Sequence, residues 1–518
     1  MVGSTNTSPA FTRLPTELLI QILEQQHYVA DTYERNIIDF ATLKSLRLAC
    51  RQYAYLPALL ADIFQHIRIE ASPEQVKVAE LLDLSSMKPY VKAITMVPSK
   101  YTWTMTEGKF QHIIWSPRAE EIFDEKFSVN DSSALGRQEI KELGLVSFVE
   151  KHTDGAMPFT KGEVATGYER YMQHARRTRE MFETKQIDRA WSRLLAELPD
   201  VDSFNIGLWN FDSSTDQNWR KRGCDLQIHG HGYGIPGHEY EACRQLHAPV
   251  GEALFRAAIA ALTTARSNVS RLEIECVVDG EFTWADDETL DGLNLSRLQS
   301  LVFDPIGADW REAGNWSREH KAAAGARCGL ALVTLLNKCS SSLRELSFFP
   351  QRSGNYFDWP PAAPNWPPVL PALGSLTTGT GLDLSGFARF LLQSPALVYL
   401  RLDGSEWRRG EWRELWDAIR NHPNRMTLNF DQLPCSNYGE CSVYHYTGEA
   451  STLDSDEDQW DNVQYCLENY LSGRSPWNRT LTLWFEESDF EFSDSDNDES
   501  DSAENDSGDD TGIDVSTS

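Results

Sequence analysis

Apolar side chains near the start of the chain recur at the spacing of an α-helix. The first amphipathic segment, residues 14–25, presents one apolar stripe made of Leu18, Leu19, Ile22 and Leu23. Pro15 suits a first helical turn, because its missing N–H would be unpaired there. Glu17 lies where the positive end of the helix dipole favours a carboxylate. The pattern therefore predicts a helix over residues 14–25.

Two further amphipathic segments follow. The segment FATLKSLRLACRQYAYL places four residues on one face: Leu43, Leu46, Cys50 and Tyr53. The next begins near Pro57 and is apolar on one side, at Leu59, Leu60, Ile63, Phe64 and Ile67. A polar stretch, residues 26–40, separates the first segment from the second and is longer than a tight helix–helix turn. We expect residues 11–69 to form a three-helix module, preceded by a disordered segment 1–10.

After residue 69 the spacing of apolar residues changes. Amphipathic helices alternate with short strands whose inward positions are predicted at Phe204, Ile206 and Leu208; Leu272, Ile274 and Cys276; Leu298, Leu301 and Phe303; Leu343, Leu346 and Phe348; Leu397, Leu400 and Leu402; and Met426, Leu428 and Phe430. The L-x-x-L-x-L core of these strands is similar to a leucine-rich repeat. One strand–helix unit cannot bury both faces alone, so the units are predicted to stack into a parallel sheet with a continuous core.

The repeat is irregular. The intervals between successive strand centres are 27, 45, 54 and 28 residues, counted along Ile274, Leu301, Leu346, Leu400 and Leu428. Regular repeats of this kind span about 20–29 residues. We therefore expect an α/β fold in which residues 70–485 form an irregular leucine-rich-repeat-like solenoid with insertions. Two insertions, 209–247 and 350–380, are rich in Gly, Pro, His or aromatic residues, and the second is predicted to contain no regular element.

Charge and composition narrow the function. The chain has 518 residues and a formal net charge of −29, and the stretch 486–518 contains 14 acidic residues and neither Lys nor Arg. That composition predicts a disordered acidic tail. Acid three residues after Ser488, Ser493 and Ser495 suits acidophilic kinases, but an entropic, solubilising tail is the preferred interpretation. An acidic body repels phosphate backbones and anionic lipid heads, so we expect no nucleic-acid and no membrane partner.

The nine cysteines include no C-x-x-C pair, and most lie in apolar runs. Free cysteine behaves there as a small hydrophobe, which suits a reducing compartment. The first residues lack an apolar signal core, and no run of about 18 apolar residues is present. We expect an intracellular protein, cytoplasmic or nuclear.

The N-terminal pattern carries a family resemblance. LPTELLIQIL, LKSLRLACRQYAYL and LLADIFQHIRI, taken in order, resemble the F-box. That resemblance implies docking onto a Skp-type linker protein and, through it, onto a cullin. It assigns the docking role to Leu14, Pro15, Glu17, Leu18, Ile22 and Leu23 on the first helix and to Leu46, Cys50 and Tyr53 on the second. The polar insert 26–40 departs from the short connection of that family.

Later strings extend the resemblance. HPNRMTLNFDQLPC, YHYTGE and YLSGRSPWNRTLTLWF look like the closing segment of large F-box-like families of filamentous fungi, and EASPEQV looks like an early segment of the same families. These strings are typical of the families but indicate no mechanism.

The sequence contains only weak signals for a cofactor, metal or catalytic site. The spacing Gly232-x-Gly234-x-x-Gly237 matches a dinucleotide fingerprint, but Pro236 lies where backbone N–H groups would face phosphate. Neither of two Cys/His groups has zinc spacing: Cys224, His229, His231, His238 and Cys243, or Cys435, Cys441, His445 and Cys466. G-x-S-x-G, H-E-x-x-H and P-loop motifs do not occur. We expect no enzyme activity, no cofactor and no metal.

These expectations combine into one hypothesis. The chain is predicted to be the substrate-recognition adaptor of a Skp-cullin-F-box type ubiquitin ligase, docking by its N-terminal helices and presenting an unknown target on the repeat domain. The aromatic loops at 209–220 and 350–370 are plausible contacts for that target. The alternative is a scaffold or interaction solenoid whose N-terminal helices are only a structural cap.

Overall fold

The computed structural model describes most of the chain between residues 60 and 485. Its gaps lie at 61–63, 82–83, 86, 100, 128–131, 153–159, 208–238, 267–268, 276, 279–287, 305, 308–317, 349–357, 360–368, 380, 404–405, 410, 436–438 and 447–458. The expected helices over 14–25 and 40–56 and the acidic tail 486–518 lie outside the described residues.

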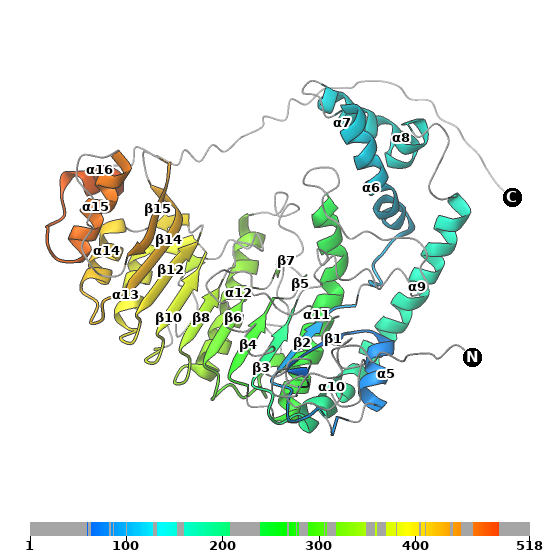
Figure 1. Ribbon diagram of the computed structural model, residues 1–518, viewed down its shortest axis with the longest axis horizontal. Helices are drawn as coiled ribbons and strands as arrows, with labels where there is room; N and C mark the ends of the chain where they lie inside the picture. Colours follow the sequence, from blue (N-terminus) through cyan, green and yellow to red (C-terminus); the bar gives the residue numbers. More distant parts are fainter. Residues whose placement is uncertain are drawn as a thin grey trace, which may run out of the picture.

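One large sheet organises the fold (Figure 1). Its ten strands follow one another in chain order, and every neighbouring pair is parallel except β14 with β15. The strands are β1 (His66–Glu70), β2 (Ala93–Val97), β3 (Ser203–Ile206), β4 (Arg271–Ile274), β6 (Ser300–Phe303), β8 (Glu345–Phe348), β10 (Ser375–Thr378), β12 (Tyr399–Asp403), β14 (Thr427–Cys435) and β15 (Gly439–Tyr446). Helices connect parallel strands, so the α/β class is confirmed.

The strands align because their inward residues share one register. A continuous row crosses the sheet through Phe204, Leu272, Leu301, Leu346, Leu376, Leu400 and Leu428. Each of these side chains is at most 1 % exposed. A one-residue slip of any strand would turn its apolar residues to the opposite face, so the burial of this row fixes the register. The strands predicted around Ile206, Ile274, Phe303, Phe348, Leu402 and Phe430 are confirmed.

Four strands of the sheet were not predicted: β1, β2, β10 and the antiparallel β15. Ile67, expected on the third N-terminal helix, lies in β1, and β2 precedes the first predicted strand. The stretch 350–380, expected to lack regular structure, contains β10 in the centre of the sheet. In β10 the second inward position is Thr378 rather than a large apolar residue, so the alternation was masked. This strand divides the 54-residue interval between Leu346 and Leu400.

Helices cover the buried face of the sheet. They are α5 (Pro73–Leu81), α10 (Gln186–Glu197), α11 (Glu239–Ala265), α12 (Arg318–Cys339), α13 (Leu384–Leu392) and α14 (Trp412–Arg420). Their buried side chains and the inward strand residues form one hydrophobic core. Between β4 and β6 the only described helical segment is the 3-10 turn η4 (Glu288–Leu290), whereas α11 and α12 lie in the neighbouring connections. Two small parallel sheets, β5 (Val277–Val278) with β7 (Ile306–Gly307) and β9 (Asp358–Trp359) with β11 (Gly381–Asp383) and β13 (Glu406–Arg409), follow the main strands.

A helical lobe lies between β2 and β3 in the sequence. It consists of α6 (Glu107–Phe127), α7 (Ser132–Leu143), α8 (Leu145–His152) and the first part of α9 (Lys161–Glu183), and it has a second, separate core. Figure 1 shows this lobe standing away from the sheet. The buried Tyr171 hydroxyl of α9 accepts the Thr102 N–H at 2.8 Å, and the Tyr101 ring stacks on His174. Helix α9 continues into the main core, so it anchors the lobe.

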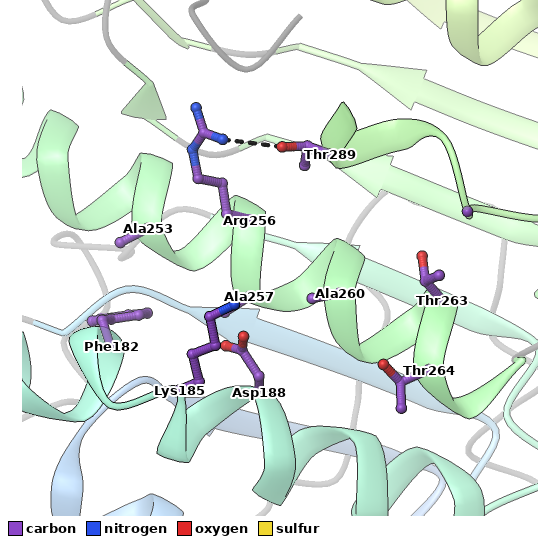
Figure 2. Close-up of a pocket in the computed structure, with 11 residues that line it drawn as sticks. Phe182, Lys185, Asp188, Ala253, Arg256, Ala257, Ala260, Thr263, Thr264 and Thr289 are labelled. Atoms are coloured by element: carbon purple, nitrogen blue, oxygen red, sulfur yellow. Dashed lines mark hydrogen bonds between the residues drawn. The ribbon is translucent and has the colours of Figure 1, made fainter. Parts of the chain in front are cut away.

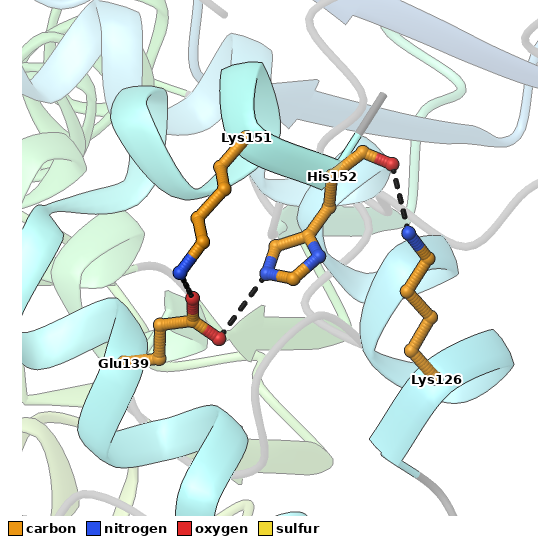
Figure 3. A network of polar contacts seen from close by, with 4 residues as sticks. All are labelled: Lys126, Glu139, Lys151 and His152. Carbon is orange, nitrogen blue, oxygen red and sulfur yellow. Dashed lines mark hydrogen bonds and ion pairs between the residues drawn. The ribbon is translucent and has the colours of Figure 1, made fainter. Parts of the chain in front are cut away.

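A polar network joins α6, α7 and α8 of the lobe (Figure 3). Lys151 of α8 donates to the Glu139 carboxylate of α7, and the His152 ring lies 3.1 Å from the other carboxylate oxygen. Lys126 of α6 donates to the His152 carbonyl at 3.1 Å. The hydrogen bond from Lys151 holds the pKa of Glu139 below its usual value.

Two helices close the far end of the sheet, opposite the lobe (Figure 1). They are α15 (Gln459–Leu471) and α16 (Arg479–Phe485). Phe485 packs against the rings of Trp412 and Trp416, which are stacked on α14, and the Arg420 guanidinium lies 4.5 Å from the centre of the Tyr470 ring. These aromatic contacts cover α14, the last of the helices that pack on the sheet. Among the described helices, none is long and apolar enough to cross a membrane.

Candidate functional site

The residues assigned to linker docking cannot be placed. All of them lie outside the described residues: Leu14, Pro15, Glu17, Leu18, Ile22, Leu23, Leu46, Cys50 and Tyr53. The described chain begins at Leu60, which is buried, and enters the edge strand β1 a few residues later. The expected N-terminal module therefore precedes one end of the sheet directly.

The face of the sheet opposite the helices is polar. It is formed by the strand residues that alternate with the buried row, and we call it the open face. Its central row consists of Arg68, Thr95, Asn205, Glu273, Val302, Ser347, Thr377, Arg401 and Asn429. All of these residues are partly or fully exposed. A sheet with one buried and one polar face gives the clean alternation of apolar and polar residues that is seen here.

Small hydroxyl residues occupy the middle of the open face. Ser300, Ser347, Ser375 and Thr377 lie on β6, β8 and β10, so small side chains cover this part of the sheet. Charged and aromatic residues flank them, with Arg271 and Glu273 on β4 and Tyr399 and Arg401 on β12. The alternation of the predicted strands implied such a face, but β10 had to be located before its central position could be seen.

A cluster of polar side chains lies beside these hydroxyls. The Asn205 amide donates to the carboxylates of both Glu273 and Glu275, the latter at 3.3 Å. Arg271 contacts the other oxygen of Glu273 at 2.6 Å. One amide thus holds two carboxylates together at the C-terminal ends of β3 and β4, the end of parallel strands where ligands bind in α/β sheets.

His66 lies at the edge of the same cluster. Its Nε2 atom is 2.7 Å from the Thr95 hydroxyl on the neighbouring strand. Burial and the nearby Arg68 lower the pKa of His66, while Glu273 acts in the opposite direction. The neutral imidazole is therefore favoured, and the negative charge of the cluster is balanced chiefly by arginine.

A cavity lies on the helical side of the sheet (Figure 2). The cavity has a volume of about 520 Å³ and lies between α10, α11 and η4. Its floor is the small-residue stripe Ala253, Ala257 and Ala260 of α11. Among the described residues between β4 and β6, only the turn η4 covers this part of α11. A Cβ atom at Gly292 would lie 2.6 Å from the Thr263 methyl, so a larger residue there would force the Thr263 side chain to shift.

The charges around this cavity are largely matched. Arg256 donates to Glu252 at 2.8 Å and to the Thr289 hydroxyl at 3.0 Å. Burial raises the pKa of Asp188, and the neighbouring Lys185 opposes that shift. A groove with paired charges and an alanine floor provides no distinctive chemistry, so the open face is the stronger candidate.

The described part of the chain offers neither a metal-binding group nor a reactive cysteine. No group of three His, Cys, Asp or Glu residues there has the geometry to hold a metal ion. The His-rich loop with His229 and His231 lies outside the described residues. Cys328, Cys339 and Cys466 are free and buried, and burial raises the pKa of Cys339 to about 12. A thiol with so high a pKa is unreactive at neutral pH.

Comparison with known proteins gives no assignment. No family model matches the chain, and no curated protein matches it. The open face and the N-terminal pattern therefore carry the functional argument.

Proposed function

We propose that the chain is the target-presenting adaptor of a Skp-cullin type ubiquitin ligase. The observation that carries the proposal is the open face, an extended polar surface that crosses a parallel sheet whose other face is fully packed. The stacked strand–helix units form an irregular leucine-rich-repeat-like solenoid with the lobe as an insertion. Such a surface suits protein recognition, because a rigid scaffold holds many polar groups in fixed positions.

The ligase contact belongs to the N-terminal segment in this proposal. The three F-box-like helices, with Leu18 and Ile22 on the first, dock onto the Skp-type linker, and the cullin follows through that linker. The segment precedes the edge strand β1, so a target on the open face and the ligase are joined by one chain. Joining them raises the effective concentration of the target and makes ubiquitin transfer nearly intramolecular.

Two variants separate the proposed contacts. Ser347→Arg places a long charged side chain at the centre of the open face, and Leu18→Asp with Ile22→Asp disrupts the linker contact. Each tagged variant is expressed in cells and its co-purifying proteins are quantified. An adaptor with the Ser347 change loses a set of bound proteins but keeps the linker and cullin. The N-terminal double variant loses the linker and cullin but keeps that set.

Asn337→Arg provides the matched control. It adds the same side chain at an exposed position of α12, on the helical side of the molecule. It should keep both the linker and the bound set. If the Ser347 and Asn337 variants retain identical partners, the open face does not bind targets. If wild-type protein brings down no linker, the adaptor proposal is wrong and a scaffold role without a ligase replaces it.

A further inference from the structure

Helix α5, at the N-terminal end of the sheet, exposes two large apolar side chains. Its inner side carries the buried Val76 and Ala79, and the helix contacts α10. Val78 and Leu81 lie on the opposite side of the helix and are 52 % and 76 % exposed. Residues three positions apart are neighbours on a helix surface, so the two side chains form one apolar patch. We call the side that carries this patch the outer face of α5.

The two ends of the row of helices on the sheet differ. At the C-terminal end, Trp412 and Trp416 of α14 are buried, and Phe485 of α16 packs against both rings. At the N-terminal end, α5 is the first described helix of the row, and its outer face has no comparable cover among the described residues. A stacked array needs a cap at each end, because the terminal unit otherwise exposes its apolar side. A cap is therefore expected over the outer face of α5.

The chain enters the described structure beside this uncovered end. Leu60 precedes the edge strand β1, and β1 leads directly into α5. Leu60 is only 7 % exposed, yet it belongs to neither of the two described cores. A buried leucine needs apolar neighbours, and the predicted amphipathic segment 40–56 is a nearby source of them along the chain. The same segment is close enough in sequence to reach α5.

The segment 40–56 has apolar residues on two sides of its predicted helix. Leu46, Cys50 and Tyr53 share the side that the F-box resemblance assigns to the linker. At about 100° per residue, Leu48 and Tyr55 lie roughly 180° around the helix from Leu46. One side can therefore contact the linker while the other packs on the body of the chain.

We propose that the segment 40–56 packs on the outer face of α5, with Leu48 and Tyr55 against Val78 and Leu81. The inference rests on the proposed function, because it reserves the opposite side of the segment for the linker. The segment is then both the missing cap of the array and part of the ligase contact. Packing on α5 fixes the orientation of the ligase relative to a target on the open face, and fixed orientation favours transfer between them.

Hydrogen exchange of the full-length chain, measured by mass spectrometry, tests the inference. The α5 variant is Val78→Gln with Leu81→Gln, which removes the apolar patch and retains good helix formers. The control variant, Leu392→Gln with Val398→Gln, makes the same two changes at positions that are 48 % and 49 % exposed, on α13 and before β12. Leu48→Gln changes the proposed partner of the patch.

We expect the amides of residues 44–56 to be protected in wild type. The α5 variant should accelerate their exchange by about tenfold, because apolar burial that opposes local opening is lost. Leu48→Gln should have the same effect, and the control variant should stay within about twofold of wild type. Exchange in β6 and β8 should be unchanged in every variant, which shows that the body remains folded.

Equal exchange of residues 44–56 in the α5 variant and the control variant would overturn the inference. Light scattering covers the rival occupant, a second copy of the chain. A dimeric wild type that becomes monomeric in the α5 variant, with exchange of 44–56 unchanged, would also overturn the inference.

Failure of the proposed function gives a different result. If the linker does not bind wild type but the α5 variant still accelerates exchange of 44–56, the segment packs on α5 as a cap and the adaptor proposal falls. If the linker binds wild type and the α5 variant leaves exchange of 44–56 unchanged, the adaptor proposal stands and the packing on α5 is wrong.

Discussion

At the scale of single residues, the buried row of the sheet carries much of the stability. Leu346 lies at its centre between Leu301 and Leu376 and is 1 % exposed. Leu346→Ala should lower the free energy of unfolding by about 2–5 kcal/mol, because transfer of the side chain and the remaining cavity both contribute. Urea denaturation followed by tryptophan fluorescence measures the change.

Val398→Ala is the control for this prediction. Val398 lies close to β12 but is 49 % exposed, so its truncation should change the free energy of unfolding by less than about 0.5 kcal/mol. If both variants unfold at the same urea concentration as wild type, the buried row does not dominate the stability of the sheet.

Residue patterns predicted much of the fold where large apolar side chains alternate. Leu400 and Leu402 identified β12 directly, and both are fully buried. Thr378 and Ile67 were missed for two different reasons. An inward threonine hides the alternation of β10, and Ile67 continues a helical spacing although it lies in a strand. The local spacing of apolar residues cannot distinguish a helix from a strand at such positions. Pairing with a neighbouring strand decides which of the two forms.

At the scale of elements, the lobe shows what the pattern of strands could not predict. Helices α6–α8 contain no L-x-x-L-x-L core, and their buried residues, such as Trp115 and Phe148, form a core of their own. The candidate site likewise has one part that the sequence pattern indicates and one part that it does not. Alternation implied a polar face, but the pairing of Asn205 with Glu275 joins residues 70 positions apart and depends on strand register. Sequence spacing contains no direct signal for that contact.

The polar network of the lobe should make it sensitive to acid. Lys151 lowers the pKa of Glu139 below its usual value of 4.5. Because the folded-state pKa lies below the unfolded-state value, the stabilising contribution is complete above about pH 4.5 and is lost as the pH falls through the lowered pKa. Hydrogen exchange of the α7 and α8 amides, corrected for intrinsic rates, should therefore accelerate in acid before that of β6 and β8.

Glu139→Gln should remove most of this acid dependence, since glutamine has no carboxylate to protonate. Glu142→Gln provides the control, because Glu142 is exposed on the same helix and its described partner is the uncharged Gln138. An unchanged acid response in the Glu139 variant would show that another group loosens the lobe.

At the scale of the whole molecule, the described residues form an open sheet covered by helices on one face, with a different structure at each end. The lobe lies toward the N-terminal end of the sheet, and the aromatic contacts of α15 and α16 close the other end (Figure 1). Stacked arrays need such end structures, because the last unit would otherwise expose its apolar face. In the proposed function, the open face between these ends holds a target, and the chain before β1 contacts the ligase.

Direct binding between the purified full-length chain and a purified Skp-type linker tests this account most directly. Isothermal titration calorimetry should show stoichiometric binding by wild type and none by the Leu18→Asp, Ile22→Asp double variant, whose circular dichroism should match that of wild type. Absence of binding by wild type at micromolar concentrations would contradict the adaptor function and leave a target-binding scaffold that works without a ligase.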